Sequence, residues 1–233
     1  ALYDIVGEAG VGEGASVLDI GGRDAAQALD LAERFGCRVV SVDPVQSNLD
    51  FAAEDIAAHD HGHLVDIALG EINAIPADDD AFDAVFSRDM LGHVEDLDGA
   101  LAECRRVLRT GGPMIVHAVF GTDLLTERER DELCWDIAEV PERLDVEDFE
   151  ARARAAGFTI EHLERIGSEW LEALLEGSDG ERRLLRAARM RRARDALLEQ
   201  MGEVPFRIVR GNDLYTIYRM IGKLEDRVYV LRG

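Results

Sequence analysis

Several residue types that mark special classes of protein are scarce in this chain. Only 3 of its 233 residues are cysteine and 5 are proline, which argues against a disulfide scaffold and against proline-rich disorder. The cysteines are widely separated and give no zinc-binding pattern, so we expect a reducing compartment, the cytoplasm. No apolar run approaches the roughly 20 residues that a bilayer span needs, and the first residues do not resemble a signal peptide.

Positive charge is scarce as well. The chain has 26 basic and 48 acidic residues, a net charge of -22, and Lys223 is its only lysine. A field of this sign repels phosphate backbones and anionic lipid headgroups, so we expect neither nucleic acid nor a membrane as a partner. We expect a small molecule instead, and a homodimer is left open.

Short apolar runs alternate with segments of helical periodicity along most of the chain. Strands are predicted at 16–20, 38–42, 64–69, 82–87, 113–118, 158–165 and 227–231, and helices at 24–35, 46–58, 97–108, 145–156 and 207–221. This alternation predicts an α/β fold, a doubly wound and mostly parallel sheet of seven strands. We expect a single domain over 1–233, with a helical insertion at 168–222 before a last, antiparallel strand.

Ligands of such sheets bind where the strands end at their carboxyl termini. Asp19 lies in the first predicted strand, Gly21 and Gly22 follow it, and Asp43 ends the next strand. This pattern is typical of a site for an adenosine-bearing ligand, in which the second acid binds the ribose hydroxyls. The dinucleotide pattern G-x-G-x-x-G is absent, and Asp24 would repel a pyrophosphate. The cationic groups of S-adenosylmethionine would instead be attracted to these carboxylates.

Six motifs in order over residues 15–166 resemble the class I S-adenosylmethionine-dependent methyltransferases. They are Val17–Gly21, Val39–Pro44, Gly70–Ile72, Ile75–Pro76 with Phe82–Ser87, Leu91–Asp96 and Ala100–Gly112. The resemblance implies a Rossmann-like fold, S-adenosylmethionine as cofactor, and methyl transfer to a small-molecule acceptor by in-line displacement. The cofactor-binding residues that it implies are Asp19, Gly21, Gly22, Arg23, Asp43, Pro44, Glu71, Ile72, Ser87 and Arg88.

The glycine loop departs from the family pattern D-x-G-x-G-x-G, because Arg23 and Ala25 replace its second and third glycines. Arg23 could pair with the methionine carboxylate of the cofactor, or it could fill the space where the ligand would lie. The sequence leaves both alternatives open.

Two groups of histidines could carry chemistry. His93 and His117 follow the carboxyl ends of predicted strands and are candidates for a general base, with helix capping or packing as the alternative. His59, His61 and His63 alternate along the chain as metal ligands can. Their turn is predicted to lie away from the ligand edge of the sheet, so we expect an exposed turn and no metal.

Acceptor contacts are expected from the ligand edge of the sheet and from the insertion. Met90, Trp170, Tyr215 and Tyr218 are the candidates, and segment 168–222 would act as a lid over the acceptor pocket. The alternatives are that these aromatic side chains pack in a core and that the insertion forms a dimer contact. Two other functions stay open: an S-adenosylmethionine-binding catalyst of isomerisation or cyclisation, and a non-catalytic interaction protein that no longer binds the cofactor.

Overall fold

The structure of the chain is a computed structural model that describes residues 2–168, 171 and 180–233. The predicted acceptor contact Trp170 lies outside these residues. The chain forms two compact units. The first, the sheet unit, comprises the residues up to Ala118 together with Phe149–Glu164 and Val228–Gly233. The second, the helical unit, comprises Val119–Asp148 and the described residues of Arg165–Arg227.

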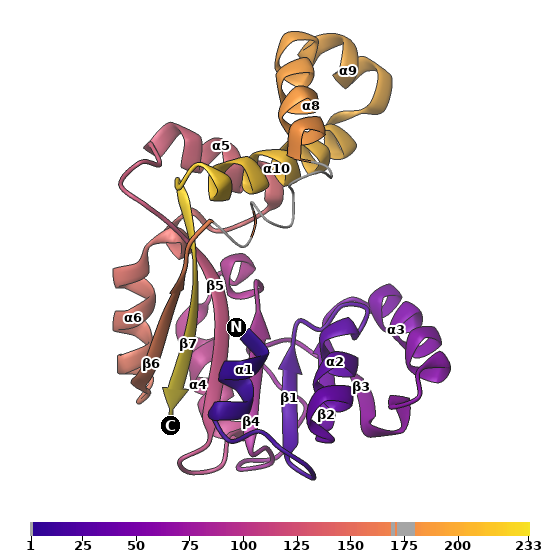
Figure 1. The fold of residues 1–233 in the computed structure, drawn as a ribbon, viewed down its shortest axis with the longest axis vertical. Coiled ribbons are helices and arrows are strands. Elements are labelled where there is room, and N and C mark those ends of the chain that lie inside the picture. The colour runs from indigo at the N-terminus through magenta and orange to yellow at the C-terminus, as the bar shows by residue number, and fades with distance from the viewer. Residues whose placement is uncertain (1, 169–170, 172–179) are drawn as a thin grey trace. The chain divides into compact units, whose positions relative to one another are not determined.

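The predicted seven-stranded sheet is confirmed. Its strands are β1 (Ser16–Ile20), β2 (Arg38–Asp43), β3 (Val65–Leu69), β4 (Ala84–Arg88), β5 (Pro113–Gly121), β6 (Thr159–Ile166) and β7 (Leu224–Arg232). Their order is β3-β2-β1-β4-β5-β7-β6, and β1 to β5 pair in parallel (Figure 1). Strand β7 runs antiparallel to β5 and β6, as expected for the last strand. Strands β1, β4 and β5 read as nearly continuous apolar runs because both faces of this part of the sheet are covered.

The sheet unit contains five of the α-helices. They are α1 (Leu2–Glu8), α2 (Ala26–Phe35), α3 (Gln46–Ala58), α4 (Leu97–Val107) and most of α6 (Val146–Ala155), with short 3₁₀ turns η1 (Gly62–Leu64) and η2 (Leu91–His93). Helix α2 buries an apolar stripe and ends at Gly36, whose φ of 63° suits a left-handed cap. Helix α4 begins at Asp96, whose side chain accepts a hydrogen bond from the backbone N–H of Gly99.

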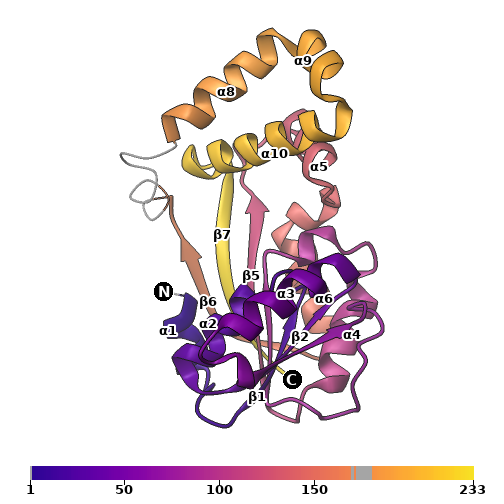
Figure 2. The ribbon, with the colours of Figure 1, turned by 90° about the vertical axis from the view of Figure 1, so that its right-hand side faces the viewer.

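The helical unit contains the described residues of segment 168–222 and one helix that the sequence did not predict. Its elements are α5 (Glu127–Ile137), η3 (Pro141–Leu144), α8 (Gly180–Arg192), α9 (Arg194–Met201) and α10 (Glu203–Met220). Helix α10 packs against both α5 and α8 (Figure 2). It begins four residues before the predicted start, and Pro205 is compatible with this start because proline is tolerated in the first turn of a helix. The described residues from Gly180 to Met201 form two helices, α8 and α9, that are separated at Ala193.

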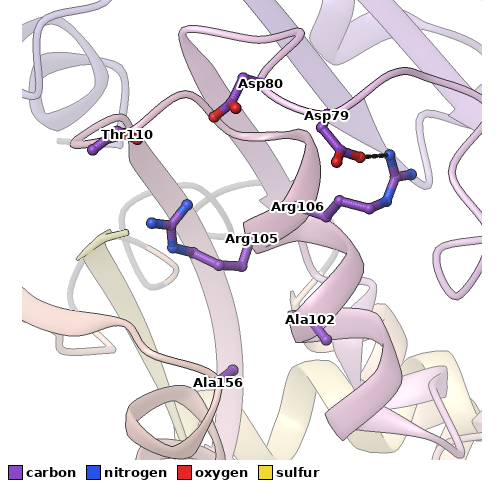
Figure 3. Close-up of a pocket in the computed structure, with 7 residues that line it drawn as sticks. All are labelled: Asp79, Asp80, Ala102, Arg105, Arg106, Thr110 and Ala156. Carbon is purple, nitrogen blue, oxygen red and sulfur yellow. Dashed lines mark hydrogen bonds and ion pairs between the residues drawn. The ribbon is translucent and has the colours of Figure 1, made fainter.

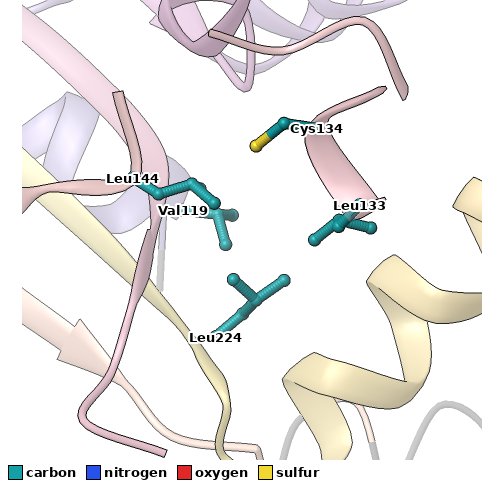
Figure 4. Packing of buried hydrophobic residues seen from close by; sticks show 5 residues of the cluster. All are labelled: Val119, Leu133, Cys134, Leu144 and Leu224. Carbon is teal, nitrogen blue, oxygen red and sulfur yellow. The ribbon is translucent and has the colours of Figure 1, made fainter. Parts of the chain in front are cut away.

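A small apolar cluster and buried ion pairs hold the helical unit together. The cluster consists of Val119, Leu133, Cys134, Leu144 and Leu224 (Figure 4). Tyr215 and Tyr218 are half-buried against it. Asp136 of α5 accepts two hydrogen bonds from Arg210 of α10, at 2.6 and 2.7 Å, and Asp213 of α10 accepts two from Arg186 of α8.

Candidate functional site

Strand register decides which predicted site residues share a face of the sheet. Asp19 of β1 lies opposite Ser41 of β2 and Phe86 of β4. Side chains alternate along a strand, and residues paired in register point to the same face. Asp43 and Arg88, two residues after Ser41 and Phe86, therefore project from the face of Asp19.

The same rule extends this face to β5 and separates two predicted cofactor residues. His117 pairs with Arg88 and joins the face that Asp19 and Asp43 share. Ser87 pairs with Ile20 and Val116 and projects from the opposite face. Its hydroxyl is buried and has no hydrogen-bond partner among the described residues. The register thus brings together Asp19, Asp43, Arg88 and His117, but not the side chain of Ser87.

Asp19 is a buried carboxylate, only 2% exposed. Burial raises its pKa to about 7; a hydrogen bond from Ser41 Oγ to Asp19 Oδ2, at 3.0 Å, acts in the opposite direction. The negative charges of Asp43 and Asp24 raise the pKa further. Among the described residues no cation pairs with Asp19. The Asp19 carboxylate therefore lacks a compensating positive charge, which a cationic ligand could supply.

The loop after β1 approaches these carboxylates closely. A Cβ atom at Gly22 would overlap Ser41 Oγ and come within 2.6 Å of Asp19 Oδ2, so this position requires glycine. At Gly21 a Cβ atom would overlap the side chain of Met90, a predicted acceptor contact. Met90 therefore lies directly against the glycine loop.

The glycine loop keeps a left-handed backbone at the two positions where this chain lacks the glycines of the family pattern. Arg23 and Ala25 have φ values of 48° and 57°, in the region that glycine favours. The backbone N–H of Arg23 donates a hydrogen bond to Asp43 Oδ2 at 3.0 Å, which fixes the loop to the end of β2. The Arg23 side chain is exposed and pairs with no described residue, so it is available to a ligand carboxylate.

Asp43 already accepts hydrogen bonds from two backbone N–H groups and one side chain of the protein. Its Oδ1 accepts hydrogen bonds from the Val45 N–H at 2.9 Å and from Asn48 Nδ2 at 3.0 Å, and its Oδ2 accepts the bond from Arg23. A carboxylate offers about four acceptor positions, so one position, on Oδ2, is left. Asp43 can therefore accept one further hydroxyl in this arrangement, whereas both ribose hydroxyls would need a rearrangement.

The other predicted cofactor residues lie at the same edge of the sheet. Pro44 is exposed directly after Asp43, and β3 ends in register with Asp43. The turn after β3 contains Glu71, which is exposed, and Ile72, which is half-buried. A hydrogen bond from the Ala74 N–H to the Glu71 carbonyl, at 3.0 Å, closes this turn.

The histidines separate into an edge pair and a turn. His117 is buried, with 8% exposure, whereas His93 is exposed in η2. In the turn, the His61 N–H donates to His59 Nδ1 at 3.2 Å. No group of three or more His, Cys, Asp or Glu side chains that could hold a metal ion occurs within the described residues.

A polar pocket of about 500 Å³ lies in the sheet unit near the amino-terminal ends of β4 and β5 (Figure 3). It is lined by Asp79, Asp80, Ala102, Arg105, Arg106, Thr110 and Ala156. Arg106 there forms ion pairs with Glu103 and Asp79. None of the predicted site residues lines this pocket, so it is separate from the candidate site.

The sequence of the sheet unit is similar to the sequences of known methyltransferases. A family model described as a methyltransferase domain matches residues 18–116, which extend from β1 into β5. Sarcosine/dimethylglycine N-methyltransferase from Halorhodospira halochloris is 30% identical over 105 residues, or 45% of this chain and 38% of that protein. The chain thus aligns with less than half the length of this relative.

Two solved structures share the fold over nearly the whole chain. A protein from Galdieria sulphuraria, solved as a candidate sarcosine dimethylglycine methyltransferase, has a TM-score of 0.75 and 17% identity, covering 99% of this chain and 82% of that one. The [4+2]-cyclase SpnF has a TM-score of 0.73 and 22% identity, covering 100% and 79%. No helix in the described part of the chain is both long and apolar enough to cross a membrane.

Proposed function

We propose that the chain is a class I S-adenosylmethionine-dependent methyltransferase that transfers the methyl group of S-adenosylmethionine to a small-molecule acceptor. The match of residues 18–116 to a methyltransferase domain supports this proposal. The observation that carries this proposal is the uncompensated negative charge at the ends of β1 and β2. Asp19 is buried without a cation among the described residues, and Asp43 and Asp24 raise its pKa. A sulfonium and an ammonium group are the charges that would relieve this repulsion.

The residues at this edge fit S-adenosylmethionine, which when bound supplies an electrophilic methyl group on its sulfonium sulfur. We assign Asp19 to the cationic part of the cofactor, because it is the carboxylate with the raised pKa. The remaining acceptor position of Asp43 would take one ribose hydroxyl. The exposed guanidinium of Arg23 would pair with the methionine carboxylate, and the turn at Glu71 and Ile72 would hold adenine.

Most of the rate of such a displacement comes from holding the nucleophile in line with the methyl carbon and sulfur. An acceptor that must lose a proton needs a base in addition. His117 is the better placed candidate, since it projects from the face of Asp19, while His93 lies in the turn after β4. Ser87 would act through its backbone, because its side chain is on the other face.

We retain segment 168–222 as a proposed lid over the acceptor. The helices α8, α9 and α10, which lie in the described part of this segment, support an insertion with its own packing. Tyr215 and Tyr218 pack on the apolar cluster of that unit, which favours a core role for both over an acceptor contact. A homodimer and a cytoplasmic location also stay predictions.

The test is to measure binding and transfer separately. Calorimetry with S-adenosylmethionine and S-adenosylhomocysteine reports binding, and tritiated methyl groups report transfer to a pool of small molecules. Asp19→Asn should weaken cofactor binding by at least tenfold. The matched control Asp66→Asn removes the same charge from an exposed position on β3 and should change nothing. Binding without label transfer would favour a non-methylating catalyst, whose fold the cyclase shares, and no binding would favour an interaction protein.

A further inference from the structure

The shared face of the sheet changes its charge between β1 and β4. Asp19 and Asp43 lie on β1 and β2, and Arg88 and His117 lie on β4 and β5. The order β2-β1-β4-β5 therefore places two carboxylates on one side of a line and two basic groups on the other. If the carboxylates hold the cofactor, the basic groups face the neighbouring space, where an acceptor must lie to reach the methyl group.

Arg88 ends a strand of the sheet, and no described residue pairs with its guanidinium. It ends β4, and the next residue extends the ladder, because the Asp89 N–H donates to the His117 carbonyl at 2.8 Å. Its side chain is exposed and forms no hydrogen bond or ion pair with any described residue. Arg106 and Arg109 of the sheet unit each pair with a carboxylate. Arg23, at the same edge as Arg88, also pairs with no described residue, and we assign its guanidinium to a ligand carboxylate as well. Acidic residues outnumber basic residues in this chain by 48 to 26, so partners for an arginine are abundant. An arginine at the ligand edge that pairs with no described residue is therefore a candidate to bind an external anion.

The surroundings of Tyr3 indicate where the Arg88 charge lies. Tyr3 of α1 donates a hydrogen bond to Asp30 Oδ2 at 2.8 Å. Burial and the Asp30 carboxylate raise the Tyr3 pKa to about 12, and the positive charge of Arg88 acts in the opposite direction. The Arg88 guanidinium is thus close enough to lower the pKa of the Tyr3 hydroxyl. The carboxylate beside that hydroxyl, Asp30, is already hydrogen-bonded to Tyr3.

We propose that Arg88 binds a carboxylate of the acceptor, so that the molecule methylated by this chain is a small organic acid. The proposal rests on the proposed methyl transfer and differs from the sequence prediction, in which Arg88 contacts the cofactor. A guanidinium forms two parallel, charge-assisted hydrogen bonds with a carboxylate. We assign the methionine carboxylate of the cofactor to Arg23, and the sulfonium and ammonium groups that remain would repel the Arg88 guanidinium, so a carboxylate on the acceptor is the better partner for Arg88. One guanidinium also matches the single charge of a carboxylate better than the double charge of a phosphate.

The experiment identifies the acceptor and then removes the charge. Wild-type chain, tritiated-methyl S-adenosylmethionine and the small-molecule extract of the cells that express the chain are incubated, and the labelled product is identified by mass spectrometry. We expect this product to carry a carboxylate. Arg88→Gln should raise the KM of the acceptor at least tenfold and leave the Kd of S-adenosylmethionine unchanged, and Arg88→Lys should recover part of the loss. The control Arg38→Gln removes a guanidinium at the amino-terminal end of β2 and should change neither value.

Each other outcome has one meaning. A labelled acceptor without a carboxylate, or an Arg88→Gln variant with unchanged KM, overturns the proposal. A phosphate-bearing acceptor overturns it as well, and a loss of S-adenosylmethionine affinity in Arg88→Gln returns this residue to the cofactor. If wild-type chain binds S-adenosylmethionine but labels nothing, the proposed methyl transfer itself fails, and this is seen before any variant is made.

Discussion

Replacing Arg23 by glycine should stabilise the sheet unit even though it removes a residue of the candidate cofactor site. Arg23 has a φ of 48°, in the left-handed region. There the Cβ atom of an L-residue crowds the following carbonyl, at a cost of roughly 1–2 kcal/mol that glycine avoids. The Arg23 side chain is exposed and pairs with no described residue, so its removal costs little packing.

The entropy of the unfolded chain offsets part of this gain. Glycine gives the unfolded chain more freedom, worth about 0.4–1 kcal/mol. The net expectation for Arg23→Gly is therefore a stabilisation of about 1 kcal/mol, which is a rise of roughly 2–4 °C in Tm for a chain of this size. Cofactor affinity should fall at the same time, because the guanidinium that would pair with the methionine carboxylate is lost.

Urea and thermal unfolding of three variants would test this reasoning. Arg23→Ala removes the guanidinium but keeps the Cβ atom, so it should not gain stability. Ala28→Gly, in the buried face of α2, should lose about 2 kcal/mol from helix propensity and lost methyl burial. If Arg23→Gly is no more stable than Arg23→Ala, the left-handed strain is not the cause and the argument fails.

Three further outcomes follow from buried groups. The pKa of Asp19 is raised to about 7 from its usual 3.8, so the folded chain binds this proton more tightly than the unfolded chain does. The free energy of unfolding should therefore fall as pH rises from about 4 to about 7. Asp19→Asn should remove this pH dependence, measured by urea unfolding at several pH values. Gly22→Ala places a methyl group against Ser41 Oγ and Asp19 Oδ2 and should abolish cofactor binding in calorimetry. Gly12→Ala, whose methyl group would have no atom within 4 Å, should leave cofactor binding unchanged. Asp136→Ala leaves Arg210 without its buried carboxylate and should cost about 3 kcal/mol, measured as a lower Tm.

The sheet could be predicted from the sequence because its signals are local. Each parallel strand is a short apolar run ended by glycine or by aspartate, and the helices between them carry apolar residues at helical spacing. Helix α5 was missed because its first turns are mainly charged and carry little apolar periodicity. A capping box at Thr126 and Glu129 was the signal that could have located its start.

The sequence could place the site residues only at the ends of strands. Which face of the sheet each side chain projects from depends on how the strands pair. The family resemblance assigned Ser87 and Arg88, which are adjacent in the chain, to the same cofactor site. A strand alternates its side chains with a period of two, so neighbours in sequence point to opposite faces. Which face carries the cofactor acids follows from the register of β1 with β2 and β4, and that register is a long-range property that no local pattern contains.

The net charge of -22 and the local charge at Arg88 act over different distances. The field of the whole chain attracts S-adenosylmethionine, which carries one net positive charge, and repels a carboxylate. Salt screens this field beyond about 8 Å at physiological ionic strength, so the repulsion weakens the approach of an acid more than its bound state. At contact, two charge-assisted hydrogen bonds from a guanidinium outweigh the remaining distant charges. Added salt should therefore weaken the association of the cofactor and ease that of an acidic acceptor, until the salt anion itself competes for Arg88.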